Sequence, residues 1–168
     1  MRSTEAVETV REVTPEALVW LFAVLTNLGS PLFLVILVAI LYWTLDRERG
    51  AFVLGVAIGG LALTVALKNV FALPRPPSGL HLVAQEGYGF PSGHAVGSTV
   101  VYGTLAVVLD RWERRDRYVA AAVLVAVVAV SRVVTGVHYP ADVLAGVLIG
   151  VVYLAVAFAV TRHDGMRA

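Results

Sequence analysis

The sequence predicts an all-α protein, a polytopic bundle of five to six transmembrane helices that forms one membrane-embedded domain over residues 1–168. The first observation is composition: 58% of the residues are hydrophobic and only 15% are charged, whereas soluble domains carry about 25% charged residues. The second is pattern, because the polar residues are bunched between long apolar runs. That arrangement indicates membrane spans and argues against one oversized soluble core.

The N-terminal part leaves one question open. Residues 1–17 are polar and unlike a cleavable signal peptide, and within them residues 5–13 are mildly amphipathic and suited to the membrane interface. Residues 15–30, PEALVWLFAVLTNLGS, are apolar but shorter than the roughly 17–25 residues that a crossing needs. They are therefore a re-entrant, an interfacial or a short spanning segment. Whether residues 16–29 cross the membrane decides on which side the N-terminus lies.

Five further apolar runs are predicted to cross the membrane. Pro31 suits the first turn of the first run, and the adjacent Gly59 and Gly60 allow close helix contact in the second. Residues 73–93 are rich in proline and glycine and cannot be helical throughout, and DRWERRDR forms a tight charged turn after the third run. The five predicted spans are residues 32–45, 51–72, 94–109, 118–135 and 140–160.

The loop charges assign the two faces of the membrane. By the positive-inside rule, the arginine-rich face is cytoplasmic, so the face that carries the 73–93 loop and the turn before Pro140 is predicted to be extracytoplasmic, in a cell membrane. The arginines on the cytoplasmic face are Arg47, Arg49, Arg111, Arg114, Arg115, Arg117, Arg162 and Arg167.

Composition also excludes some classes of function. Cysteine is absent, which excludes disulfides and thiolate chemistry. The net charge is +1, and there is no basic run with interleaved aromatic residues, so nothing indicates a nucleic-acid partner. Faces of small residues serve helix packing within one chain as well as association, so no oligomeric state is predicted.

Six ionisable residues lie within or at the edges of the apolar spans, all on the predicted extracytoplasmic face. A single one of them would be interpreted as a snorkelling end residue or a hydrogen-bonded packing histidine. Ionisable groups in a membrane are costly unless they are paired or wetted, so six on one face indicate a functional site. These residues are Lys68, Arg75, His94, Arg132, His138 and Asp142.

The stretch SRVVTGVHYPAD indicates a nucleophile and its partner. Pro140 at a first helical position places His138 just before a helix and Asp142 one turn later, able to reach back. A carboxylate that accepts the Nδ1 proton leaves Nε2 of His138 as a nucleophile; Asp142 is equally suited to the helix dipole, and the two interpretations are compatible. Ser131 and Arg132 end the preceding helix, and Arg132 offers a planar fork of donors to phosphate oxygens.

The stretch PSGH indicates an anion pocket. Ser92 is a natural N-cap, and Gly93 lets a ligand approach the backbone. The free N–H groups of a helix start attract anions, and His94 in the first turn is placed to act as a general acid toward a bound phosphate. The alternative is an ordinary capped helix with a histidine in the headgroup zone.

The cations decide between a metal and a phosphate. Two histidines and an aspartate would suit zinc, but Lys68, Arg75 and Arg132 place three positive charges around one point. They would repel a dication and stabilise a phosphoryl transition state. The sequence therefore predicts no metal and no cofactor.

These residues resemble the type-2 phosphatidic acid phosphatase family, whose members carry the motifs K-x6-RP, PSGH and SR-x5-H-x3-D. Here they read KNVFALPRP from Lys68, PSGH from Pro91 and SRVVTGVHYPAD from Ser131, all three without a departure and in the family's order. Together they cover the chain from Lys68 to Asp142. The first forty residues carry no motif.

The resemblance implies a metal-independent lipid phosphatase with a phosphohistidine intermediate. It implies His138 as nucleophile, Asp142 as its orienting partner and His94 as the acid that then activates water. The expected substrates are phosphatidic acid, phosphatidylglycerol phosphate or a polyprenyl diphosphate, with no choice among them. The residues implied to hold the phosphate are Lys68, Arg75, Ser92, Gly93, Ser131 and Arg132.

Other functions remain to be distinguished. Vanadium haloperoxidases share the three motifs, but they are soluble, which this chain is not expected to be. A lipid phosphotransferase would use the same site with an acceptor other than water. A non-catalytic lipid-phosphate-binding protein has no need of the His138–Asp142 pair, so the intact pair favours an enzyme.

Overall fold

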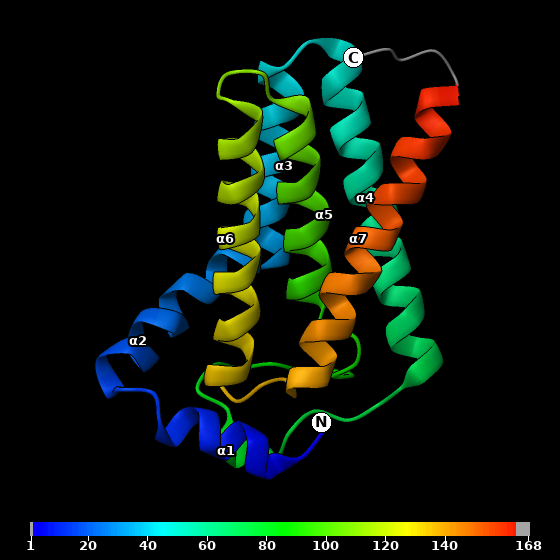
Figure 1. Ribbon diagram of the computed structural model, residues 1–168. Helices are drawn as coiled ribbons and strands as arrows, with labels where there is room; N and C mark the ends of the chain where they lie inside the picture. Colours follow the sequence, from blue (N-terminus) through cyan, green and yellow to red (C-terminus); the bar gives the residue numbers. More distant parts are fainter. Residues whose placement is uncertain (1, 164–168) are drawn as a thin grey trace.

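The computed structural model describes residues 2–163, and over that range the chain is built of helices and loops without a strand (Figure 1). Helix α5 lies at the centre of the bundle, where α4, α6 and α7 pack against it, while α3 packs mainly on α4. The elements are α1 (Thr4–Glu12), α2 (Glu16–Leu25), the 3-10 helix η1 (Thr26–Gly29), α3 (Pro31–Thr44), α4 (Arg47–Phe71), the 3-10 helix η2 (Ser78–Leu80), α5 (Gly93–Val108), α6 (Arg114–Val134) and α7 (Pro140–His163).

The first crossing of the bundle is made by a broken helix. The segments Glu16–Gly29 and Pro31–Thr44 are bent by 47° relative to each other, and together they are long and apolar enough to form one span. Helices α4, α6 and α7 each meet the same criterion, and α5 is shorter, with 16 residues. The predicted all-α membrane bundle is confirmed. Residues 16–29, whose role was open, form the first half of the broken span.

Polar caps set the helix starts. The Ser30 hydroxyl accepts a hydrogen bond from the backbone N–H of Phe33 at 3.2 Å, so the chain breaks at Ser30 and restarts as α3. Asp46 accepts from the N–H of Arg49 at 2.9 Å and begins α4. Helices α4 and α6 both begin earlier than hydropathy predicts, because their first turns are charged.

Glycines let α5 lie between its neighbours. A Cβ on Gly60 of α4 would stand 3.0 Å from the Val100 side chain, and one on Gly150 of α7 would stand 2.7 Å from Thr99. Because glycine has only a hydrogen atom in place of a side chain, α4 and α7 can approach α5 closely at these two positions. This packing encloses α5, whose Val96 is fully buried, and it fixes where the first turn of α5 lies.

The bundle has two unlike ends (Figure 1). One end, which we call the arginine end, holds the α3–α4 and α5–α6 turns and the last turn of α7. The other, the loop end, holds α1, the loop of residues 72–92 and the turn between α6 and α7. Seven of the eight arginines of the predicted cytoplasmic face fall at the arginine end; Arg167 lies outside the described residues.

Candidate active site

The predicted site residues come from six segments that meet at the loop end. Helices α4 and α6 end there and α5 and α7 begin there, so side chains far apart in the sequence become neighbours. Lys68 lies near the end of α4, Arg75 in the 72–92 loop, His94 in the first turn of α5, Arg132 in the last turn of α6, His138 in the α6–α7 turn and Asp142 in the first turn of α7.

His138 lies between a carboxylate and a guanidinium. Its Nδ1 is 3.6 Å from Oδ2 of Asp142, and Nη1 of Arg75 donates to its Nε2 at 2.9 Å. Because a guanidinium can only donate, Nε2 must carry the lone pair and Nδ1 the proton. The side chain of Asp142 also accepts from the backbone N–H of Tyr139 at 3.1 Å, which holds the carboxylate toward the turn.

Burial keeps the His138 imidazole neutral. The side chain is 1% exposed, and this desolvation is the largest cause that lowers the pKa of His138 well below its ordinary value of 6.5. The cations Arg75, Arg132 and Lys68 lower that pKa further. A neutral imidazole with a lone pair on Nε2 is the form that can act as a nucleophile.

The turn that carries His138 is fixed by backbone contacts. Gly136 has a φ of +74°, and a Cβ there would stand 2.0 Å from the carbonyl oxygen of Leu80. The N–H of Leu82 donates to the carbonyl of Thr135 at 3.0 Å, so the 72–92 loop is docked on the turn. Only glycine fits at position 136 without strain or displacement of the loop.

Arg132 lies behind the histidines, almost fully buried. Its Nη1 donates to Oγ1 of Thr26 at 2.7 Å. Its Nε and Nη2 are buried and make no hydrogen bond to any described residue. Such orphaned donors are uncommon in protein interiors, and a cluster of them indicates a place for an acceptor that the chain does not supply.

The start of α5 is tied to the start of α7. The N–H of Ser92 donates to the carbonyl of Asp142 at 3.0 Å, which sets Gly93 and His94 beside the His138 turn. Ser92 occupies the N-cap position as predicted, but its side chain caps no N–H of the helix. Its buried hydroxyl, like Nδ1 of His138 and Oδ1 of Asp142, makes no hydrogen bond to the described residues.

Lys68 and Arg75 bind only backbone oxygens and one imidazole, not carboxylates. Nζ of Lys68 donates to the carbonyl of Tyr88. Arg75 donates to the carbonyls of Glu86, Gly87 and Val137 at 3.1–3.3 Å, in addition to His138. Both cations thus pin the 72–92 loop while their charge stays uncompensated by a direct acidic partner.

Ser131 is placed differently from the other predicted site residues. Its hydroxyl is fully buried and donates to the carbonyl of Val128 at 2.6 Å, in the preceding turn of α6. It does not line the cavity described below, and neither do Ser92, Arg132 and Asp142.

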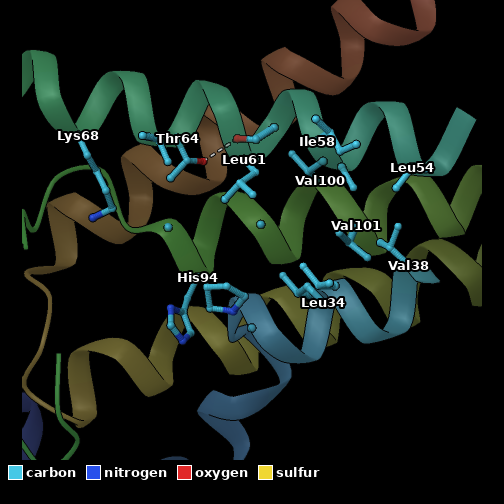
Figure 2. Close-up of a pocket in the computed structure, with 18 of the residues that line it drawn as sticks. Leu34, Val38, Leu54, Ile58, Leu61, Thr64, Lys68, His94, Val100 and Val101 are labelled. Atoms are coloured by element: carbon cyan, nitrogen blue, oxygen red, sulfur yellow. Dashed lines mark hydrogen bonds between the residues drawn. The ribbon is translucent and has the colours of Figure 1, made fainter. Parts of the chain in front are cut away.

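A cavity of about 510 Å³ leads from the histidines into the apolar part of the bundle. Lys68, Arg75, Gly93, His94 and His138 line its polar end. Figure 2 shows Lys68 and His94 at one end of the pocket, whereas the far end is formed by side chains of α3, α4 and α5, namely Val38, Leu54 and Val101. A charged end joined to an apolar channel suits a molecule with a phosphate head and a hydrocarbon tail.

A family model, described as the PAP2 superfamily, matches residues 49–165. The chain belongs to the PAP2 superfamily. It is 30% identical to phosphatidylglycerophosphatase B of Bacillus subtilis (strain 168) over 165 residues, 88% of this chain and 81% of the relative. It is also 30% identical to a putative undecaprenyl-diphosphatase of Escherichia coli (strain K12) over 151 residues, 83% of this chain and 73% of that protein.

The fold agrees with this membership. A crystal structure of a transmembrane PAP2-type phosphatidylglycerolphosphate phosphatase from Bacillus subtilis superposes with a TM-score of 0.88, covering 98% of this chain and 87% of the other at 24% identity. The family model and the bacterial relatives make the chain a membrane-embedded lipid phosphatase of the PAP2 type.

Three residues near the PAP2 site were not predicted to belong to it. Arg2 places Nε 3.5 Å from Oδ1 of Asp142 and lies over the ring of Tyr139, 5.0 Å from its centre. Thr26 contacts Arg132, and Gln85 lines the cavity. Gln85 lies in the 72–92 loop, and Arg2 and Thr26 lie outside the part matched by the family model, where the sequence carries no signal that marks them.

No group of three or more histidine, cysteine, aspartate or glutamate side chains within residues 2–163 is arranged to hold a metal ion. His94, His138 and Asp142 are instead interleaved with three cations. The metal-independent reaction stays a prediction.

Proposed function

We propose that this PAP2 enzyme hydrolyses the terminal phosphate of a lipid monophosphate or a prenyl diphosphate through a phosphohistidine on His138. The observation that carries the proposal is the setting of His138, whose Nδ1 faces Asp142 while its Nε2 faces Arg75 at the polar end of the cavity. The proposed nucleophile thus lies between its orienting group and a cation for the phosphate.

In the first step, the lone pair of Nε2 forms an N–P bond as the bond from phosphorus to the leaving oxygen breaks. A phosphate oxygen takes over the hydrogen bond that Arg75 donates to His138, and the cations hold the charge that spreads over the phosphoryl oxygens. The leaving oxygen receives a proton from His94, which lines the same cavity. The Asp142 carboxylate stabilises the positive charge that develops on the His138 ring.

In the second step, water attacks phosphorus and gives its proton to His94. The N–P bond breaks, its electron pair returns to Nε2, and inorganic phosphate leaves. Lys68, Arg75, Ser92, Gly93 and Arg132 are proposed to bind the phosphate in both steps; Ser131 contributes less directly, because its hydroxyl already donates within α6.

We propose that the lipid tail occupies the apolar part of the cavity. From Lys68 to Leu54, α4 runs along the cavity for about 21 Å at about 1.5 Å per residue, most of the way across a hydrocarbon core. Val35 of α3 and Ile58 and Leu61 of α4 line the cavity and are also more than half exposed. We propose that the cavity opens toward lipid between α3 and α4, which suits a substrate that arrives within the bilayer.

The decisive experiment measures phosphate release in detergent from phosphatidic acid, phosphatidylglycerol phosphate and a polyprenyl diphosphate, each with EDTA. We expect release with at least one of them, unchanged by EDTA, and a loss of at least about 10³-fold in His138→Ala. Activity abolished by EDTA would contradict the metal-free mechanism. Lipid binding without turnover would identify a binder, and phosphate found on an added alcohol acceptor would identify a phosphotransferase.

The intermediate can be trapped. The leaving group of a prenyl diphosphate is a prenyl monophosphate, which needs less help from an acid than an alkoxide does, whereas the second step still needs His94 to activate water. We therefore expect His94→Asn, given a prenyl diphosphate labelled in its terminal phosphate, to accumulate acid-labile label on the protein. The double variant His94→Asn/His138→Ala should carry none, and label in that variant would move the nucleophile to another residue.

We also propose that the loop end faces outward from the cell, since the arginines gather at the other end. The chain has no cysteine, so single cysteines report accessibility without a background. Ser78→Cys in the 72–92 loop should react with a membrane-impermeant maleimide on intact cells, and Glu113→Cys in the α5–α6 turn should react only after lysis. The reverse pattern would place the site in the cytoplasm.

A further inference from the structure

The break in the first span lies against the active site. At η1 the chain leaves α-helical geometry for four residues, and this short segment packs on α5 and α6. Its carbonyl at Leu28 accepts a hydrogen bond from the hydroxyl of Tyr102 at 2.7 Å. A Cβ on Gly29 would stand 2.4 Å from the Val128 side chain and 3.3 Å from the His94 side chain. The segment is thus held too closely for a larger residue at position 29.

The packing of η1 on α6 places the hydroxyl of Thr26 beside the side chain of Arg132. Thr26 is 4% exposed and Arg132 is 1% exposed, so the 2.7 Å hydrogen bond between them is shielded from solvent. Among the described residues it is the one hydrogen bond that the Arg132 side chain makes. The two residues are 106 positions apart in the sequence, and helices α2 and α6 meet there.

The choice of donor atom matters for the chemistry. Thr26 takes Nη1, which leaves the edge formed by Nε and Nη2 without a partner among the described residues. That edge has the two parallel N–H groups with which arginine binds phosphate in a bidentate manner. A hydrogen bond at Nη1 stops rotation of the guanidinium plane without using either donor of the edge.

We propose that Thr26 is a positioning residue for phosphate binding, acting through Arg132, and that the break in the first span serves to place it. The proposal rests on the proposed function, because it needs Arg132 to bind the phosphate of the substrate. Thr26 does not touch the substrate. It fixes the guanidinium in the plane in which both donors reach the phosphoryl oxygens.

The test compares Thr26→Val, which keeps the shape but removes the acceptor, with Thr26→Ser, which keeps the acceptor. We expect Thr26→Val to lower kcat/KM about tenfold or more and to weaken inhibition by inorganic phosphate by a similar factor. Thr26→Ser should stay within about twofold of the wild type. Thr104→Val is the matched control: this threonine is 1% exposed and donates only within α5, to Val100 at 2.7 Å, so its loss should leave activity and phosphate inhibition unchanged.

A double-mutant cycle separates positioning from folding. In an Arg132→Ala background, Thr26→Val should cause no further loss in kcat/KM, because nothing is left to position. An equal loss in both backgrounds, or full activity of Thr26→Val, would overturn the proposal. If Thr26→Val does not fold, as judged by thermal unfolding in detergent, Thr26→Ala replaces it in the same cycle. Hydrolysis by the wild type and its loss in His138→Ala report on the proposed function separately.

Discussion

Both ends of the bundle carry cations, but the cations of the two ends differ in their partners. At the arginine end, Arg49 and Arg117 both contact the carboxylate of Asp110, at 2.6 and 3.4 Å, and Arg49 also pairs with Asp46. The side chain of Asp110 is 64% exposed there. At the loop end, Lys68, Arg75 and Arg132 are half-buried or buried and have no carboxylate within salt-bridge distance among the described residues.

The difference shows how a cation held for structure is distinguished from one held for a ligand. Surface cations that pair with acidic side chains contribute little to stability, and the acidic partner neutralises their charge. Partly buried cations that use up only some of their donors, on carbonyls and one hydroxyl, keep both charge and hydrogen-bonding capacity for an incoming anion. In this PAP2 protein, the second kind surrounds His138.

The largest effect that separates the two ends is expected from arginine-to-lysine exchange. Arg75→Lys keeps the charge but loses the planar fork that reaches His138 and three backbone carbonyls, so we expect kcat/KM to fall about 10²-fold. Arg49→Lys, the matched exchange at the arginine end, should leave kcat/KM within about twofold. Steady-state phosphate release in detergent measures both, and similar losses in the two variants would abolish the distinction between the ends.

The second effect is a pH dependence of stability that belongs to the loop end. The folded-state pKa of His138 is well below 6.5, so unfolding takes up a proton once the pH falls below about 6.5. Stability should therefore decrease with falling pH, by up to about 1.4 kcal/mol per unit for this one group, and level off below the folded-state pKa.

Thermal unfolding in detergent between pH 7 and 5, for the wild type and for His138→Asn, isolates that contribution. The asparagine variant cannot take up the proton, so the difference between the two curves should shrink or change sign as the pH falls. A difference that stays constant with pH would mean that His138 is not held neutral by its surroundings.

The sequence defined the helical core and the three motifs well, because both depend on local pattern. The starts of α3, α5 and α7 follow from Pro31, Ser92 and Pro140, each of which stands where a helix must begin. The starts of α4 and α6 were predicted too late, because Arg47 and Arg114 belong to helices that extend beyond the apolar run. Hydropathy detects the lipid-facing part of a helix and not its polar end.

What the sequence did not reveal depends on contacts between distant segments. Thr26 is one hydroxyl in an apolar run, and nothing nearby marks it as the partner of Arg132. By hydropathy, the apolar run before Ser30 is too short to cross the membrane. No local sequence pattern shows that α2 continues into α3 across a bend. No local pattern marks Gln85 as a cavity residue, because the docking of its loop on the α6–α7 turn is a property of the fold.

The smallest predicted effect concerns Arg2, which among the described residues is the one arginine of the loop end that pairs with an acidic side chain. Its Nε lies 3.5 Å from Asp142, but the side chain is 24% exposed, and it also donates to the carbonyl of Pro74. Because Asp142 is held by the Tyr139 N–H as well, loss of Arg2 should weaken its orientation without releasing it. We expect Arg2→Gln to lower kcat about twofold to fivefold, with Arg2→Lys closer to the wild type, since lysine keeps the charge beside the carboxylate. A loss as large as that of Arg75→Lys would contradict this expectation. It would place Arg2 among the cations that bind the phosphate and not among those that only pair with an acidic side chain.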